Sequence, residues 1–375
     1  MFNNLRELIA TMPDEKTCRD YLAAQRWNGK VVCPYCKHEK CYSIEKGARW
    51  KCADSKCYKR FTVTVGTFFE ASNIPLHKWF PAIYIAISHK KGISSYQLGR
   101  DIGVTQKTAW FMLHRIREGV RTKEDVMLGE NAPVEADETF VGGKYSNMHP
   151  AKRKKMLENG DGFTNKTTVL GMIERGGTLV AKVIPKGQPY KIAVTVGETV
   201  IKKATLITDS TNVYQKVISS YNHLSVNHSI NQYVQDNTHT NTIEGAFSHF
   251  KRMIYGIYHQ ISAKHTQRYC NEFAHRYNTR KLHDADRFNI ALTKTECRLR
   301  YKALVAPKEA PETMQLTAKP VNRNKGVFQL KDGELLGQYT SALDAQNKTG
   351  INRSNIYNTC KGKRTEAGGY DWIFA

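Results

Sequence analysis

The sequence has 375 residues and is 40% apolar, so the chain is long enough for two or more globular domains with separate cores. Its 57 Lys and Arg outnumber 34 Asp and Glu, and the formal net charge of +23 favours a polyanionic partner, first of all nucleic acid. The sequence contains no run of about 18 apolar residues and no apolar signal-peptide centre, so we expect a cytoplasmic protein with no membrane partner.

After a helical lead-in over residues 1–27, five of the nine cysteines crowd into a short segment. Cys33-Pro-Tyr-Cys36 and Cys52-Ala-Asp-Ser-Lys-Cys57 are two tight pairs joined by strand-like sequence. Paired cysteines in an intracellular chain indicate a metal site, and four thiolates suit one structural Zn²⁺. We therefore predict a zinc ribbon over residues 28–70, with Cys41 as a spare candidate ligand. The alternative is a group of buried structural cysteines without metal.

Residues 71–122 predict three helices that end in a helix-turn-helix. Ser94 or Ser95 can cap the second helix, Gly103 permits a left-handed turn, and Thr105 can cap the third.

The third helix of such a unit enters the major groove of DNA. We expect Gln106, Lys107 and Thr108 to meet base edges, and Arg115 and Arg117 to reach phosphates. The alternative is a plain three-helix packing unit or a protein-binding module.

A polar linker over residues 123–131 leads to a predicted α/β domain at residues 132–302. In chain order, its elements are strands Ala132–Val141, Thr168–Ile173 and Thr178–Ile184, helix Tyr190–Lys203, strand Ala204–Asp209, helix Val213–Ser220 and strand Leu224–Val226. A basic loop that contains Lys152-Arg-Lys-Lys155 separates the first two strands. This order is the layout of a ribonuclease-H-like catalytic core, a mixed β-sheet flanked by helices.

Two aspartates of this domain fall where strands adjoin: Asp137 lies in the first strand and Asp209 ends the fourth. The helical stretch 241–252 carries Glu244 and Lys251 on one side, seven positions apart. Carboxylates gathered in one place need cations between them, so we predict a divalent metal pair on the two aspartates and Glu244, with Lys251 on a phosphate. The alternative for this stretch is an ordinary amphipathic helix with a solvated charged face.

The chain resembles the DDE-type insertion-sequence transposases, in the group with an N-terminal zinc ribbon and a final acid followed seven residues later by lysine. The resemblance covers residues 1 to about 302. Besides the two cysteine pairs, its motifs are Phe61 to Gly66-Thr67-Phe68, Leu76, Lys78-Trp79, Ile93-Ser94, Gln106 to Trp110, Asp137 to Lys144, Thr208-Asp209, Asn241 to Glu244, Lys251-Arg252 and Gly256 to His259.

The resemblance implies cleavage at transposon ends by water and joining of the 3′-hydroxyl to target DNA, with two Mg²⁺ or Mn²⁺ per active site. Some relatives use asparagine at the third metal position, so Asn241 is our second choice after Glu244. Glu138 adjoins Asp137 but should point to the opposite face of its strand. Arg252 is a further candidate for DNA contact. We expect His239, His249 and His259 to be hydrogen-bond donors rather than metal ligands.

A proline-containing linker over residues 303–322 precedes a small α+β module at residues 323–375. The module resembles the NUMOD-type DNA-binding motif appended to homing endonucleases, and it departs from the usual transposase pattern. Its candidate DNA contacts are Ser354, Asn355, Lys361, Lys363 and Arg364. The alternative is a small packing or oligomerisation module.

The leading hypothesis is therefore a multidomain α/β DNA transposase that acts as a homo-oligomer on double-stranded DNA, nucleoid-associated in a prokaryotic cell. One rival is a DNA-binding regulator that descends from a transposase and lacks catalysis. Another is a nuclease of the same fold that cuts DNA without joining it.

Overall fold

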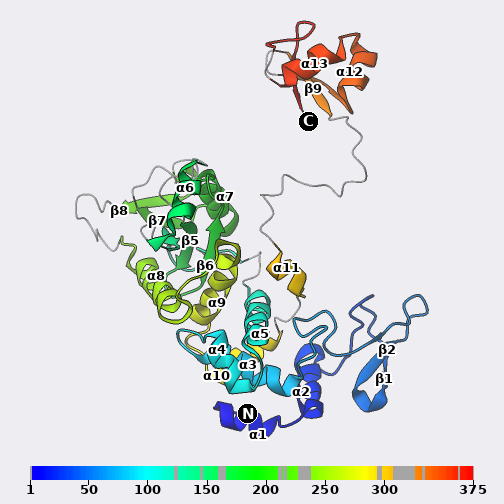
Figure 1. Ribbon diagram of the computed structural model, residues 1–375, viewed down its shortest axis with the longest axis vertical. Coiled ribbons are helices and arrows are strands. Elements are labelled where there is room, and N and C mark those ends of the chain that lie inside the picture. Colours follow the sequence, from blue (N-terminus) through cyan, green and yellow to red (C-terminus); the bar gives the residue numbers. More distant parts are fainter. Residues whose placement is uncertain are drawn as a thin grey trace. The chain divides into compact units, whose positions relative to one another are not determined.

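A computed structural model describes residues 2–121, 126–143, 147–158, 166–209, 214, 218–226, 238–293, 298–306, 326–331, 334–361 and 364–374. The chain divides into two compact units, Met1–Ala306 and Pro307–Ala375 (Figure 1). None of the helices in these described ranges is long and apolar enough to cross a membrane.

The chain starts with two short helices, α1 (Leu5–Thr11) and α2 (Glu15–Trp27), and a small antiparallel sheet. The sheet has the strand order β1 (Cys41–Ile44), β2 (Arg49–Cys52) and β3 (Arg60–Phe61). Trp50 and Phe61 stack on its inner face, and Trp27 of α2 meets Trp50 edge-on at a ring-centroid distance of 4.9 Å. Aromatic packing thus fixes the sheet to α2.

Three helices follow: α3 (Leu76–Ser88), α4 (Ser95–Ile102) and α5 (Gln106–Gly119). The predicted signals at their ends are confirmed. The Ser94 side chain accepts from the backbone N–H of Gln97, Gly103 has φ +63°, and the Thr105 side chain accepts from the N–H of Thr108. Of the two serines, Ser94 is thus the cap.

A five-stranded mixed sheet forms the next part, in the order β6-β5-β4-β7-β8. Its strands are β4 (Val134–Val141), β5 (Thr167–Glu174), β6 (Leu179–Ile184), β7 (Thr205–Asp209) and β8 (Asn222–Val226). The β4-β5-β6 pairs are antiparallel, whereas β4-β7 and β7-β8 are parallel. The arrangement is consistent with the expected ribonuclease-H-like core.

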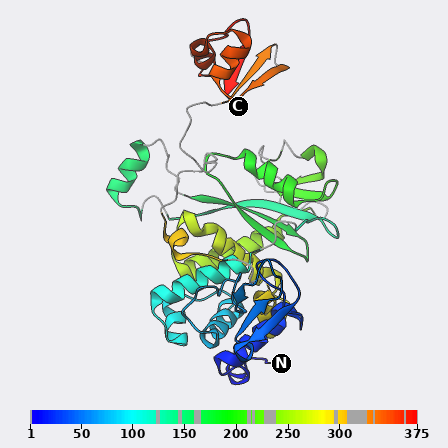
Figure 2. The same cartoon turned by 90° about the vertical axis from the view of Figure 1, so that its right-hand side faces the viewer.

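Each face of this sheet has its own helices and its own hydrophobic core. Helix α7 (Tyr190–Thr199) packs on the face that carries Val134, Ala136 and Leu206. Helices α8 (Asn241–Met253) and α9 (Thr266–Asn278) cover the other face, and they lie together along it in Figures 1 and 2. A π-helical turn, Ile254–Tyr258, continues α8.

Several helices differ from the sequence prediction in their presence or their bounds. The basic segment predicted as a loop contains helix α6 (Pro150–Glu158), because Lys, Arg, Met and Leu favour a helix even without an apolar period. Helix α7 ends four residues before the predicted Lys203, since Val200 is extended and bridges to Leu128. Within the predicted helix 213–220 only Tyr214 and the 3₁₀ turn Ile218–Ser220 lie in the described part of the chain.

The last helices of the first unit return to its N-terminal part. Helix α10 (Asp284–Thr293) buries Phe288 between Phe2, Phe80 and Tyr84, so it belongs to the core of α1 to α5 rather than to that of the sheet. A short helix α11 (Tyr301–Val305) follows where the linker was expected to begin.

The second unit is a three-stranded antiparallel sheet with two helices. Its strand order is β10 (Glu334–Tyr339), β9 (Val327–Lys331) and β11 (Asp371–Phe374), and the helices are α12 (Ala342–Thr349) and α13 (Arg353–Cys360). The sequence predicted the hairpin and both helices but not β11, whose Trp372 is buried in the small core.

Candidate active site and zinc centre

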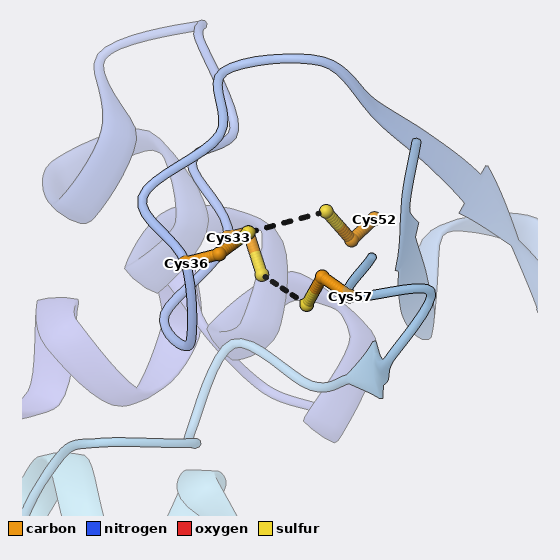
Figure 3. Close-up of side chains that lie close together, drawn as sticks. All are labelled: Cys33, Cys36, Cys52 and Cys57. Carbon is orange, nitrogen blue, oxygen red and sulfur yellow. Dashed lines mark hydrogen bonds between the residues drawn. The ribbon is translucent and has the colours of Figure 1, made fainter. Parts of the chain in front are cut away.

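The sulfur atoms of Cys33, Cys36, Cys52 and Cys57 all lie within 4.8 Å of one another (Figure 3). The Sγ–Sγ distance is 3.8 Å for Cys33 and Cys57, and 3.5 Å for Cys36 and Cys52. Tetrahedral zinc with Zn–S bonds of about 2.3 Å needs sulfurs about 3.8 Å apart. The four thiols therefore fit the predicted structural Zn²⁺, and they leave no ligand position open for chemistry.

Both cysteine pairs lie on turns of the same kind. The N–H of Lys37 donates to Cys33 O, and the N–H of Tyr58 donates to Asp54 O, each at 2.9 Å. Lys37 and Tyr58, each directly after the second cysteine of a pair, have φ values of +63° and +48°. Cys41 lies outside the group of four, so it is not a ligand in this arrangement.

The two aspartates of the candidate active site lie on neighbouring parallel strands. Val134 pairs with Leu206 and Glu135 with Ile207, and this register, continued by two residues, sets Asp137 beside Asp209. Leu206 faces α7, and side chains alternate along a strand, so Asp209 is on the face toward α8. Asp137 shares the α8 face with Glu135 for the same reason.

Glu135 fastens α8 to this face of the sheet. Its fully buried carboxylate accepts hydrogen bonds from the backbone N–H groups of Thr242 and Ile243 at 2.9 and 3.0 Å. The Thr242 hydroxyl and the Arg175 guanidinium donate to its other oxygen at 2.9 and 2.7 Å. An acid from β4 therefore supplies the cap that the chain before α8 does not, and it holds the first turn of that helix close to Asp137.

Gly171 allows α8 to approach the sheet closely at this point. It pairs with Asp137 across β4 and β5, and an added Cβ would lie 2.7 Å from both Ile243 Cδ1 and Phe247 Cζ. Ile243 and Phe247 are buried, whereas Glu244 and Lys251 are exposed on the same helix. The predicted division between an apolar face and a charged face is confirmed for α8.

The three candidate carboxylates lie on the same side of the sheet, but they are farther apart than the four thiols of the zinc centre. The ligand atoms of the four cysteines lie within 4.8 Å of one another. Among the described residues, the carboxylate oxygens of Asp137, Asp209 and Glu244 do not form a group as close as this. Glu244 Oε1 accepts a hydrogen bond from Thr240 Oγ1 at 2.8 Å. Asn241, the second-choice ligand, is exposed in the first turn of α8.

Glu138 points away from α8, as its strand position predicted. It accepts a hydrogen bond from the hydroxyl of Tyr214, a residue of the core beneath α7. Burial and the nearby charges of Asp137 and Asp209 raise the pKa of Glu138 to about 7, although the Tyr214 hydrogen bond opposes this rise.

The three histidines that were not expected to bind metal lie apart from one another. His239 is next to Glu135, with Nδ1 3.5 Å from Oε1, while His249 and His259 are exposed. None of them joins a metal-binding group among the residues that the structure describes.

Two of the expected DNA contacts are instead internal. Arg115 is 4% exposed and donates to Phe68 O and Leu299 O, and Arg117 is 1% exposed and donates to Glu272 Oε2 at 2.6 Å. Arg115 thus faces the chain before α3 and the chain before α11, and Arg117 faces α9, so neighbouring segments cover this side of α5. The prediction that they reach phosphates is therefore wrong for this arrangement.

The other candidates on α5 remain near its exposed N-terminus. Lys107 is exposed, with Nζ 5.3 Å from the centre of the Tyr301 ring. Gln106 donates to Ser95 Oγ at 2.8 Å, and Thr108 shares a hydrogen bond with Thr105 at 2.9 Å.

The candidates in the second unit lie on and after α13. Ser354 and Arg364 are exposed and Asn355 is half-buried, while Lys361 Nζ lies 4.6 Å from the centre of the Tyr357 ring. Lys363 lies outside the described residues.

Comparison with known proteins gives two family matches. Residues 127–278 match the family described as ISXO2-like transposase domain, and residues 13–60 match the transposase zinc-ribbon domain. An uncharacterized protein in transposable element ISH50 of Halobacterium salinarum is 28% identical over 258 residues, which cover 66% of this chain and 85% of that protein.

Among solved structures, a chain of the simian T-cell lymphotropic virus intasome in complex with PP2A regulatory subunit B56 gamma matches with a TM-score of 0.22 and 14% identity. The match covers 66% of this chain and 84% of that chain. By these two family matches the chain contains a transposase domain of the ISXO2-like kind, preceded by a transposase zinc-ribbon domain.

Proposed function

We propose that this transposase binds the terminal inverted repeats of its element, cleaves the DNA at these ends and joins the 3′-hydroxyl ends to target DNA. The observation that carries the proposal is the register of β4 and β7, which sets Asp137 beside Asp209 on the face that α8 covers. The exposed Glu244 lies on that helix, whose first turn Glu135 holds against β4.

Asp137, Asp209 and Glu244 supply carboxylate oxygens, the ligands that Mg²⁺ and Mn²⁺ prefer. Two such ions, when bound, activate the attacking oxygen and stabilise the leaving oxygen of a phosphodiester displacement. Lys251 is exposed in the last turn of α8, two turns beyond Glu244, and it would hold a phosphate of the bound DNA end. Asn241 is the alternative third ligand.

Several exposed or half-buried polar and basic groups support contact with double-stranded DNA. Gln106, Lys107 and Thr108 lie in the first turn of α5, and Arg252 follows Lys251 on α8. In the second unit we propose contacts from Ser354, Asn355, Lys361, Lys363 and Arg364. The working complex would be a homo-oligomer, because two transposon ends must be held together for joining.

The central test is strand transfer of a pre-cleaved inverted-repeat end in Mg²⁺ by the wild type and Asp209→Asn. Loss of a metal ligand should lower the rate by at least about a hundredfold, since even outer-shell substitutions cost 10- to 100-fold. Glu198→Gln, an exposed acid on α7 at the other face of the sheet, is the control and should keep full activity. Equal activity of Asp209→Asn and wild type would refute the metal assignment.

The same assay separates the remaining choices. Glu244→Gln should abolish strand transfer while Asn241→Ala retains it, and the reverse result would make Asn241 the third ligand. Nicked ends without covalent joining to target would identify a nuclease. Specific DNA binding that resists a chelator, with no nicking by any variant, would identify a regulator.

Zinc content tests the ribbon independently. Cys33→Ser should lose about one zinc per chain and destabilise residues 28–70, because metal binding and folding are linked in such sites. Cys41→Ser is the matched control, since Cys41 lies outside the group of four, and it should retain the metal. Zinc retained by Cys33→Ser would contradict the ligand set.

A further inference from the structure

The small sheet of the zinc ribbon has two chemically different faces. Its inner face carries Trp50 and Phe61, which are paired across β2 and β3 and buried against α2. On the other face, Tyr42 pairs with Lys51 and Lys51 with Arg60, so these three side chains form a row across all three strands. We refer to this side of the sheet as the outer face (β1 and β2 are labelled in Figure 1).

The outer face combines positive charge with exposed aromatic rings. Lys51 Nζ lies 4.2 Å from the centre of the Tyr58 ring. Tyr42 and Tyr58 are 54% and 56% exposed, and Arg60 is exposed as well. Tyrosines with more than half of their surface in water contribute little to a core, so packing alone does not account for these rings.

The charges on this face are not neutralised within the protein. Lys51 and Arg60 are directly opposite each other, and like charges in that position destabilise a sheet. No carboxylate forms an ion pair with either residue in the described parts of the chain. The nearby acids are otherwise engaged, since Glu45 pairs with Arg49 and Asp54 accepts from the N–H of Lys56. An external polyanion would relieve the repulsion.

We infer that the outer face of the ribbon, formed by Tyr42, Lys51, Tyr58 and Arg60, is a contact surface for the sugar-phosphate backbone of duplex DNA. The two cations meet phosphate oxygens, and the tyrosine hydroxyls donate to the backbone. The inference rests on the proposed function, because it adds a DNA contact region to those proposed on α5, on α8 and in the second unit. Zn²⁺ held by the four cysteines would stabilise the ribbon and is not part of this contact surface.

The experiment measures binding of the full-length, zinc-loaded protein to a labelled mixed-sequence duplex as a function of salt concentration. Each phosphate contact contributes about 0.9 to the slope of log affinity against log salt. Lys51→Gln/Arg60→Gln should therefore lower the slope by about 2 and weaken binding on the order of tenfold at physiological salt. Zinc content should be unchanged and the unfolding temperature should not fall, since both side chains lie outside the ribbon core and their mutual repulsion is removed.

Two further variants make the test specific. Arg6→Gln/Lys16→Gln removes the same charge from exposed positions of α1 and α2, and it should leave slope and affinity unchanged. Tyr42→Ser should weaken binding without changing the slope, because the tyrosine contact is not ionic.

The outcomes separate this inference from the proposed function. If the wild type binds DNA and transfers strands while Lys51→Gln/Arg60→Gln has the wild-type slope, the outer face is not a DNA contact and the proposed function stands. An equal loss in the Arg6→Gln/Lys16→Gln control would show only an effect of net charge and would overturn the assignment. A wild type that fails to bind any duplex would contradict both. If Lys51→Gln/Arg60→Gln still binds DNA like the wild type but no longer captures an acidic protein, the outer face is a contact surface for a protein partner instead.

Discussion

His114 is a buried imidazole at the junction of α5 and α9. Its ring lies 4.5 Å from Trp110 and 4.6 Å from His265 between centroids, and neither nitrogen has a hydrogen-bond partner among the described residues. Burial, with the charges of Arg117, His265 and Arg268, depresses the pKa of His114 far below its usual range. Burial and then the Arg268 and Lys264 charges lower the pKa of His265 to about 4. Both rings are therefore neutral in the fold.

This pair predicts a loss of stability in acid. Unfolded histidine titrates near pH 6.5, so below that pH the unfolded chain binds protons that the folded chain does not. The stabilisation is complete above about pH 6.5 and is lost as the pH falls toward about 4. Calorimetry should show a lower Tm near pH 5 than near pH 7, and His114→Phe should reduce the difference. The exposed His38→Gln is the control, and an unchanged acid response of His114→Phe would contradict the prediction.

At the scale of elements, the candidate active site depends on how α8 is attached to β4. The attachment consists of the Glu135 carboxylate at the start of the helix and the Gly171 contact one turn later. Neither residue touches the proposed substrate. Both set where Glu244 stands relative to Asp137 and Asp209.

Glu135→Ala should therefore disturb both stability and catalysis. The substitution removes the acceptor of two backbone N–H groups and one of the acceptors of the Arg175 guanidinium, which should lower the free energy of unfolding by about 3 kcal/mol. Urea unfolding measures this loss, with the exposed Glu198→Ala expected within about 0.5 kcal/mol of the wild type. In folded protein, strand transfer should fall while duplex binding persists. If Glu135→Ala had the stability and the strand-transfer activity of the wild type, other contacts would be what holds α8 in place.

At the scale of the molecule, a buried ionic cluster joins the helix-turn-helix to the helices of the catalytic sheet. Glu272 of α9 accepts from Arg117 of α5 at 2.6 Å, from Arg276, and from the Tyr258 hydroxyl at 2.6 Å. Arg276 also donates to Ala86 O at the end of α3. Burial lowers the pKa of Arg276 to about 10, which still leaves it charged at neutral pH.

Glu272→Gln should weaken this junction strongly, because it leaves two guanidinium groups buried without a counter-charge. Breaking such a buried pair costs about 3 to 5 kcal/mol, and thermal unfolding should show the loss. Glu118→Gln is the matched control, since Glu118 also links α5 to α9 through Arg268 but both side chains are about one-fifth exposed. Its cost should stay below about 1 kcal/mol. Comparable effects of the two variants would mean that burial does not set the strength of the junction.

Signals that act within a few residues could be predicted from the sequence. The caps at Ser94 and Thr105, the turn at Gly103 and the zinc-binding cysteine pairs depend on local hydrogen bonds and ligand spacing. The order of strands likewise placed Asp137 and Asp209 on adjoining strands. A glutamate two residues before Asp137, on the same face of the strand, was a readable signal for Glu135, but Thr242 and Ile243, which it holds, are more than one hundred positions away in the sequence.

The tertiary structure alone decided which charged side chains are available. Arg115 and Arg117 look like other basic residues of the helix-turn-helix, yet neighbouring segments cover them. Arg60 is exposed and Lys51 half-buried, because both lie on the side of their strands opposite to Trp50 and Phe61. Helix α10 joined the N-terminal core for the same reason, since an apolar face does not specify its partner. By itself the sequence determined most of the helices and strands and the four cysteines of the zinc centre. Packing between distant segments decided which charges meet a partner inside the protein and which remain on its surface.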